Sequence, residues 1–191
     1  MNPSLPLLVI IGPSGSGKSS AARLLVNRGL LRVHPTWTTR PRRSDEHFGT
    51  PEHRFVDDAT FDALVDADFF LDAVSLFGLP YRYGLPPIRR SSDLRVDTVM
   101  LRAPLVEPFK RVVTDPLVVV QIEDDPLQIS DRLHRRAGTA LELRCRLDDN
   151  ERETAAGRAV ADRVLVNDGT LDELADALAG IVASSRRPVR T

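Results

Sequence analysis

A glycine-rich stretch near the start of the chain, Gly12-Pro13-Ser14-Gly15-Ser16-Gly17-Lys18-Ser19, has the residue types and spacing of a phosphate-binding loop. It follows the apolar run Leu5–Ile11 and precedes an amphipathic helical pattern. Backbone N–H groups of such a loop, together with the start of the helix, wrap phosphate oxygens. We expect the Lys18 ammonium to reach the β and γ phosphates of a nucleoside triphosphate and the Ser19 hydroxyl to ligate Mg²⁺. The predicted nucleotide-binding set also includes Ser20.

A second feature that could bind phosphate follows the first helical pattern. Arg40 and Arg43 are three residues apart in a polar segment and could present two guanidinium groups to one dianionic phosphate. Arginine binds phosphate through two parallel hydrogen bonds, which lysine cannot do. The alternative is a solvated basic turn. Together with the loop, the pair favours transfer of a phosphoryl group onto an acceptor that is itself phosphorylated.

Alternating apolar and amphipathic segments must position these residues. Short continuous apolar runs are typical of strands buried on both faces of a parallel sheet. Helical patterns separate them, so we predict right-handed βαβ units and a doubly wound sheet. The predicted strands lie at 5–11, 98–101, 117–122 and 164–166, and the predicted helices at 18–28, 127–136, 141–158 and 171–183.

The segment from Arg32 to Ile88 breaks this rhythm with short strand-like pieces, many Pro and Gly residues, and a helix capped by aspartate. We interpret it as an inserted lobe. The predicted organisation is a core of residues 1–31 and 92–191, with a lid at about 132–150, and an acceptor-binding lobe of residues 32–91.

Composition restricts the partners. The formal charge of -1 and the pI near 6.4 argue against bulk electrostatic binding to nucleic acid or to an anionic membrane. No apolar run approaches the roughly 18 residues of a membrane span, and the apolar start leads into the glycine loop instead of a cleavage site. The single cysteine, Cys145, fits a reducing cytoplasm. We expect a cytoplasmic protein, monomeric or homodimeric, with no nucleic-acid or membrane partner.

Two other polar groups have simpler interpretations. His34, His47 and His134 have no metal-ligand spacing, so no metal cage is predicted. The run Glu123-Asp124-Asp125 follows an apolar strand at its carboxyl end, where α/β proteins bind ligands. The same residues could cap the next helix, and we favour that cap.

The segment from Thr36 to Gly84 resembles the acceptor lobe of guanylate kinases. The residues that match in order and spacing are Thr36, Thr39-Arg40, Arg43, Glu46, Gly49, His53, Phe55-Val56, Phe70-Leu71-Asp72, Gly78 and Tyr83-Gly84. The likeness covers most of the chain, because the segment 132–153 is similar to that family's lid and 166–168 to its adenine-side loop. It implies a three-layer α/β fold of the P-loop NTPase type, with a parallel five-stranded sheet, an inserted lobe and a helical lid.

The resemblance also implies the activity and the roles of the residues. ATP, with Mg²⁺, would phosphorylate GMP or a related nucleoside monophosphate. Arg40, Arg43 and Tyr83 would hold the acceptor phosphate, with His53 at the place of the family's second phosphate-binding tyrosine. Thr36 and Asp72 would face the base. Arg132, Asn167 and Asp168 would lie on the adenine side.

The lid contributes five arginines, of which we expect one or two in the site. Phosphoryl transfer spreads negative charge over the equatorial oxygens, and an arginine delivered when the lid closes stabilises it. The five are Arg132, Arg135, Arg136, Arg144 and Arg146. We assign Arg136 and Arg146, with Lys18, as catalytic.

Several departures from the family pattern concern the base. Asp72 is shorter than the family's glutamate, Leu85 stands where a hydroxyl residue is expected, and no carboxylate lies around Leu101-Arg102-Ala103. These changes keep phosphate binding and weaken guanine recognition. The stretch Gly78–Pro86 is also similar to ribose 1,5-bisphosphate phosphokinases, which makes a sugar phosphate the second acceptor hypothesis. A non-catalytic binding module of this family is the third, although the intact phosphate loop weighs against it.

Overall fold

The computed structural model describes residues 5–42, 52–75, 80–90, 93–136 and 139–185, without the side chains of Arg136, Glu142 and Ser185. Arg43, Glu46, Gly49 and Gly78 of the family pattern lie outside these residues.

Five parallel strands form the central sheet in the order β2-β7-β1-β8-β9. These strands are β1 (Leu7–Ile11), β2 (Leu31–Val33), β7 (Val96–Met100), β8 (Leu117–Glu123) and β9 (Arg163–Val166). All of β1 is buried, because it lies between β7 and β8 in the middle of the sheet. A continuous apolar run is the pattern that such a position requires. The predicted five-stranded parallel sheet is therefore confirmed.

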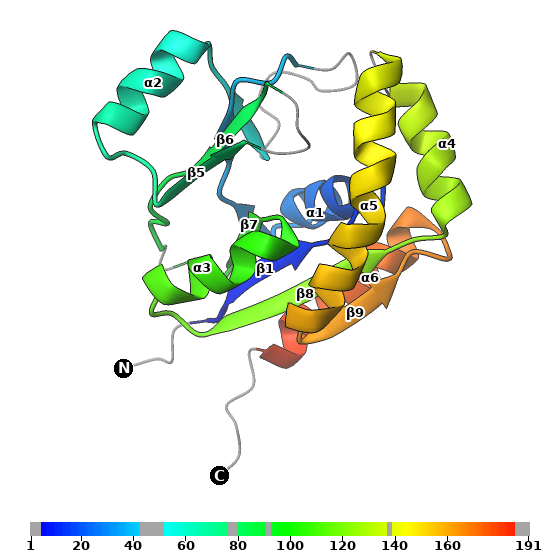
Figure 1. The fold of residues 1–191 in the computed structure, drawn as a ribbon. Coiled ribbons are helices and arrows are strands. Elements are labelled where there is room, and N and C mark those ends of the chain that lie inside the picture. Colours follow the sequence, from blue (N-terminus) through cyan, green and yellow to red (C-terminus); the bar gives the residue numbers. More distant parts are fainter. Residues whose placement is uncertain (1–4, 43–51, 76–79, 91–92, 137–138, 186–191) are drawn as a thin grey trace.

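Helices cover both faces of this sheet (Figure 1). Leu8 and Ile10 of β1 face α1 (Lys18–Asn27) and α6 (Leu171–Ser185). The alternate residues of β1, such as Val9, face α3 (Val106–Val112) and α5 (Ala140–Val160). The period of two along a strand gives the sheet a separate apolar core on each side. A short helix η1 (Ala103–Leu105) leads into α3, and α4 (Pro126–Arg136) packs beside α5.

A second sheet, of four strands, has the order β4-β3-β6-β5. It consists of β3 (Thr36–Thr38), β4 (His53–Phe55), β5 (Asp72–Ser75) and β6 (Arg82–Leu85), with helix α2 (Asp58–Asp66) beside it. Asp57 caps α2 by accepting a hydrogen bond from Thr60 N at 2.7 Å. The Trp37 ring contacts those of Phe69 and Phe70, and the Phe61 ring of α2 stacks on Phe70, which ties the helix to the sheet.

A buried carboxylate joins the core to both connections of the second sheet. Asp97 of β7 lies 2.8 Å from His34 Nε2, just before β3, and 3.1 Å from Arg90 Nε, after β6. Because Asp97 is 2% exposed, these contacts are shielded from solvent. They fix where the small sheet leaves the core and where the chain returns.

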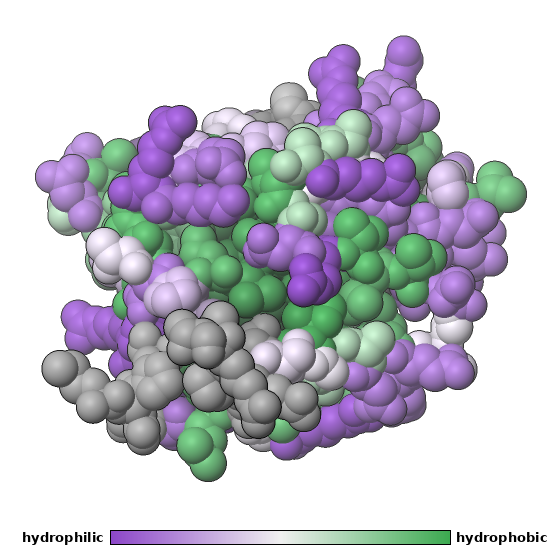
Figure 2. All heavy atoms as spheres, turned by 90° about the horizontal axis from the view of Figure 1, so that it is seen from below, coloured by the Kyte–Doolittle hydropathy of each residue, from purple (hydrophilic) through white to green (hydrophobic). Residues whose placement is uncertain are grey.

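The surface has hydrophobic as well as hydrophilic regions. Seen from below in Figure 2, hydrophobic residues gather around the middle of the face, and hydrophilic residues lie mostly at its margins. None of the helices in the described part of the chain has the length and apolar character to cross a membrane.

Candidate active site

Two glycines let the chain turn from β1 into α1. Gly12 has φ +132°, and a Cβ there would lie 2.2 Å from the Ile122 carbonyl oxygen. Gly17 has φ +95°, and its Cβ would lie 2.8 Å from Asn167 Nδ2. Since other residues rarely adopt these angles, the sequence needs glycine at both positions to form the loop.

Side chains hold every carbonyl group of the loop from Gly12 to Ser16. The bonds are Lys18 Nζ to Gly12 O (2.8 Å) and Pro13 O (2.6 Å), Asn150 Nδ2 to Ser14 O (3.2 Å), Arg132 Nη1 to Gly15 O (2.9 Å) and Asn167 Nδ2 to Ser16 O (3.2 Å). The donors come from α1, α4, α5 and the residue after β9. They fix the peptide planes of the loop, which is the preorganisation that backbone anion binding requires.

Lys18 is charged at neutral pH but holds its proton less tightly than an exposed lysine. Burial of the ammonium lowers the pKa of Lys18 from 10.5 to about 8. The Glu153 carboxylate opposes this shift, whereas the Arg102 guanidinium adds to it. The Lys18 ammonium is therefore influenced by charges from α5 and from the segment between β7 and η1.

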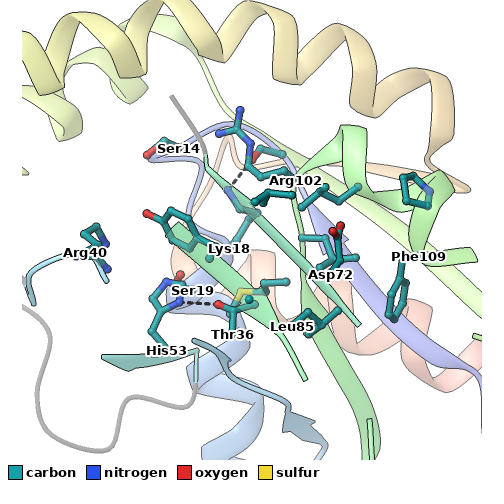
Figure 3. A pocket seen from close by; sticks show the side chains of 18 of the residues that line it. Ser14, Lys18, Ser19, Thr36, Arg40, His53, Asp72, Leu85, Arg102 and Phe109 are labelled. Carbon is teal, nitrogen blue, oxygen red and sulfur yellow. Dashed lines mark hydrogen bonds between the residues drawn. The ribbon is translucent and has the colours of Figure 1, made fainter. Parts of the chain in front are cut away.

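A cavity of about 330 Å³ connects the phosphate loop with the second sheet. One part is polar and is lined by Gly12, Ser14, Gly15, Lys18, Ser19, Thr36, Arg40, His53, Tyr83, Arg102 and Arg146. The other part is lined by Leu71, Val74, Leu85, Met100, Leu101, Leu105, Pro108, Phe109 and Val112, together with Asp72 and Gly84. In Figure 3, Arg40 and His53 lie on one side of the cavity and Asp72 and Phe109 on the other. The cavity thus offers cations to phosphate at one end and apolar surface at the other.

The second sheet contributes the residues predicted to bind the acceptor. Arg40 is 4% exposed, donates from Nη1 to Pro41 O at 2.8 Å, and lies over the Phe55 ring at 5.2 Å. Thr36 Oγ1 and His53 Nδ1 are 2.8 Å apart. The structure therefore brings the predicted phosphate-binding residues Arg40, His53 and Tyr83 into the same cavity as Lys18. Thr36 and Asp72, which are predicted to face the base, line that cavity too. Arg43 lies outside the described residues.

The lid arginines differ in where they lie. Arg146 is 4% exposed, lines the cavity, and donates from Nη1 to Ser14 Oγ at 3.2 Å. The Arg144 side chain is 83% exposed, and Arg135 is also exposed. Arg136 ends α4, and its side chain is not described. Among the described lid arginines, Arg146 and Arg132 reach the phosphate loop.

The nucleotide-side predictions are brought together only in part. Asn167 donates to the loop at Ser16 O, as described above, and its backbone N–H donates to Glu123 O at 2.8 Å. Asp168 is exposed and does not line the cavity. Ser20 is half-buried in α1, and it too is absent from the cavity lining.

Sequence reasoning missed three polar residues of the site. They are Asn150, Glu153 and Arg102. Asn150 and Glu153 lie four and seven residues after Arg146, which places these two residues on the same face of α5 as Arg146. Arg102 lines the cavity, with Nε 2.9 Å from Glu153 Oε2 and a further ion pair to Asp149. Glu153 Oε1 accepts from Ala103 N at 2.8 Å, and burial raises the pKa of Glu153 although Arg102 acts against it. Helical spacing from Arg146 could have identified the residues on α5.

The acidic run Glu123-Asp124-Asp125 begins with the last residue of β8 and is only partly a helix cap, so that interpretation was wrong for Glu123 and Asp124. Asp125 Oδ1 accepts from Leu127 N at 2.7 Å and caps α4. Glu123 instead pairs with Arg158, with Oε2 2.5 Å from Nη2, and lies near the end of the central sheet. Asp124 bonds to Arg132 and Asn167.

The cavity has the donor that a nucleotide-bound Mg²⁺ would need. No group of three or more His, Cys, Asp or Glu side chains within the described ranges could hold a metal ion by itself. The Ser19 hydroxyl lines the cavity at the start of α1. Because Mg²⁺ keeps several waters and is usually bound through phosphates and few protein groups, a single hydroxyl fits.

A parallel sheet whose first strand leads through this loop into a helix, with arginines facing the loop across a cavity, defines a phosphotransferase of the P-loop type. Comparisons with known proteins give the family. The chain is 30% identical to a guanylate kinase of Thermus thermophilus over 188 residues, covering 96% of this chain and 84% of the relative. It is 31% identical to that of Rhizobium etli, covering 94% and 82%. The chain therefore belongs to the guanylate kinase family.

A solved structure shares the fold. The crystal structure of guanylate kinase from Anaplasma phagocytophilum superposes with a TM-score of 0.68 over 96% of this chain and 87% of that one, at 20% identity. No family model matches the chain.

Proposed function

We propose that this chain is an ATP-dependent, Mg²⁺-requiring kinase that phosphorylates GMP or a related nucleoside monophosphate. The observation that carries the proposal is that Lys18 of the phosphate loop and Arg40 of the second sheet line one cavity. Residues between about 32 and 91 would bind the acceptor, and residues of about 132–150 would form the lid. Relatives that are 30% identical and bear the name guanylate kinase support the choice of acceptor.

In this mechanism the protein supplies position and charge instead of a nucleophile. Arg40, His53 and Tyr83 hold the acceptor phosphate, and Arg43 is assigned to the same group. An ionised oxygen of that phosphate attacks the γ-phosphorus in line, and the bond from phosphorus to the β–γ bridging oxygen breaks. The products are ADP and a nucleoside diphosphate. The acceptor oxygen is already ionised, so the reaction needs no general base.

The loop and the lid stabilise the charge that spreads during transfer. Lys18 is assigned to the β and γ phosphates and Arg146 to the equatorial oxygens, since both line the cavity at the loop. Arg136 keeps its assignment from the sequence. Mg²⁺, ligated by Ser19 and phosphate oxygens, would neutralise part of the charge. Because both substrates would already be held in one cavity, little further translational and rotational entropy would have to be lost in the transfer step.

Turnover with GMP tests this function directly. ADP release is measured in a coupled assay for the wild type, Lys18→Ala and Lys110→Ala. The Lys18 variant should lose about 30- to 150-fold in kcat, the value of a transition-state charge contact of about 2 to 3 kcal/mol. Lys110 is exposed and pairs with Glu107 at 2.8 Å, so its removal is a matched control. A Lys18 variant that melts like the wild type and keeps more than about a tenth of kcat contradicts the assignment.

A sugar-phosphate acceptor is tested in the same assay. Ribose 1,5-bisphosphate replaces GMP, and the ratio of the two kcat/KM values decides between the hypotheses. Transfer to a hydroxyl of this sugar would need a base, because a hydroxyl is not ionised at neutral pH, whereas transfer to one of its phosphate groups would not. Asp72 and His53 line the cavity and are the candidates.

A further inference from the structure

A carboxylate next to the phosphate loop has no role in the mechanism above. Asp124 follows β8 directly after Glu123, and its side chain is 2% exposed. Its Oδ2 atom accepts a hydrogen bond from Asn167 Nδ2 at 2.7 Å. The same oxygen accepts from Arg132 Nη1, which makes an ion pair that is buried on the side of the carboxylate and partly exposed on the side of the arginine.

Both donors also hold the phosphate loop. Arg132 Nη1 donates to Gly15 O at 2.9 Å, and Asn167 Nδ2 donates to Ser16 O at 3.2 Å. One oxygen of Asp124 thus fixes two side chains, which in turn fix two successive carbonyl groups of the loop. The amide of Asn167 also packs against Gly17, where a Cβ would be 2.8 Å away.

The connection has a physical reason. Arginine and asparagine side chains have several rotamers, and each loses conformational entropy when it is held in one geometry. A buried carboxylate that accepts from both compensates this loss with charge-assisted hydrogen bonds. Without it, Arg132 would be left near the loop with an uncompensated charge, and neither donor would be held toward its carbonyl.

We propose that Asp124 is a positioning residue for ATP binding, which acts through Arg132 and Asn167 on the peptide planes of Gly15 and Ser16. It would set the affinity for the nucleotide without contacting it. The proposal rests on the proposed function in one respect, namely that the loop binds ATP or ADP. Its neighbour Asp125 has a different task, because it caps α4.

The difference between the two neighbours provides a matched experiment. ADP binding is measured by calorimetry for the wild type, Asp124→Ala, Asp124→Asn and Asp125→Asn, and KM values for ATP and GMP are measured on the same preparations. Asp124→Ala should raise the Kd for ADP by about 10-fold, the order expected when a buried charge-assisted hydrogen bond is lost. Asp124→Asn should show a smaller increase, because an amide oxygen can accept both bonds but carries no charge. Asp125→Asn removes the same charge and should stay within about 2-fold, since asparagine caps helices as well as aspartate.

The pattern of the KM values separates positioning from a general loss of structure. The Asp124 variants should raise KM for ATP and leave KM for GMP unchanged. Equal increases in both KM values, or Asp124 variants that bind ADP as the wild type does, overturn the proposal. If Asp124→Ala does not fold, the comparison of Asp124→Asn with Asp125→Asn decides in the same way. A wild type that binds no ADP overturns the proposed function, and the role of Asp124 with it.

Discussion

Asn150 and Ser14 form a closed pair of hydrogen bonds between α5 and the phosphate loop. Ser14 N donates to Asn150 Oδ1 at 3.0 Å, and Asn150 Nδ2 donates to Ser14 O at 3.2 Å. Asn150 is 8% exposed, and Arg146 lies one helical turn before it on the same face. Arg146, which we assign to the transferred phosphoryl group, therefore lies on α5 one turn before Asn150, the residue through which this helix is bonded to the phosphate loop.

Removing this attachment should affect both stability and turnover. Asn150→Ala loses two partly buried hydrogen bonds, each worth about 0.5 to 1.5 kcal/mol, so the free energy of unfolding should fall by about 1 to 3 kcal/mol. We also expect kcat/KM for ATP to fall, because Arg146 and Ser14 lose their fixed relation. Arg152→Ala, at an exposed position of α5, is the control. Thermal melting and steady-state kinetics check both effects, and equal behaviour of the two variants would contradict the role.

The lowered pKa of Lys18 predicts how nucleotide capture depends on pH. In the ligand-free protein the ammonium loses its proton near pH 8, mainly because it is buried. Below that pH the cation is present and attracts phosphate, and above it the neutral amine does not. We therefore expect kcat/KM for ATP to fall as pH rises through about 8, and kcat to fall less, because bound phosphates favour the charged form.

A Lys18→Arg variant provides the control for this pH dependence. Arginine keeps its charge over the whole range, so any remaining activity should lack the decrease above pH 8. The measurement is kcat/KM for ATP between pH 6.5 and 9.5 at saturating GMP. A wild-type profile that is flat across this range would show that Lys18 stays protonated in the free protein.

The Arg40 assignment predicts an effect confined to the acceptor. Arg40→Ala removes a charge-assisted bond worth roughly 1.5 to 3 kcal/mol, so kcat/KM for the acceptor should fall about 10- to 150-fold. The sequence predicts the same for Arg43→Ala. KM for ATP should not change, and Arg54→Ala, exposed on β4, should leave both substrates unaffected. Should ATP affinity fall as much as acceptor affinity, the second sheet would not be the acceptor site.

The sequence predicted those helices and strands that hydrophobic periodicity or a motif within the segment itself identifies. The run Leu7–Ile11, the glycine loop and helix α1 follow one another without interruption, so periodicity and motif agree there. Helix α3 was not predicted, because Pro104 and Pro108 interrupt the short helical pattern around Val106. Its apolar side chains are held by packing against the sheet instead.

Contacts between distant segments were beyond sequence reasoning. Asp124 and Asp125 are neighbours with the same side chain. Asp125 nevertheless caps α4, whereas Asp124 bonds to Asn167, which is 43 residues away. Arg102 pairs with Glu153 across a similar separation. Propensity and spacing describe neighbours along the chain, whereas these pairs depend on how α5 and β9 pack against the core.

The last prediction concerns which base the cavity selects, and it follows from the apolar end. A site that hydrogen-bonds a base rejects an analogue by about 10⁴- to 10⁵-fold only where its own buried polar groups would lose their partners. Leu85 and Leu101 line the cavity and offer no such groups, so we expect Asp72 and Thr36 to read the base. We therefore expect discrimination of GMP against AMP below about 100-fold.

The test is kcat/KM for GMP, dGMP, AMP, CMP, UMP and ribose 1,5-bisphosphate, all on one preparation. Asp72→Asn should reduce the remaining preference for GMP. A carboxylate can accept from both N1–H and the N2 amino group of guanine, and adenine has neither of these two donors. Ser75→Ala, exposed on the same strand, is the control and should change no ratio. A wild-type preference for GMP above about 10³-fold would mean that backbone groups or other residues complete the guanine site, because hydrogen-bond readout of that size requires partners that Asp72 and Thr36 alone do not supply.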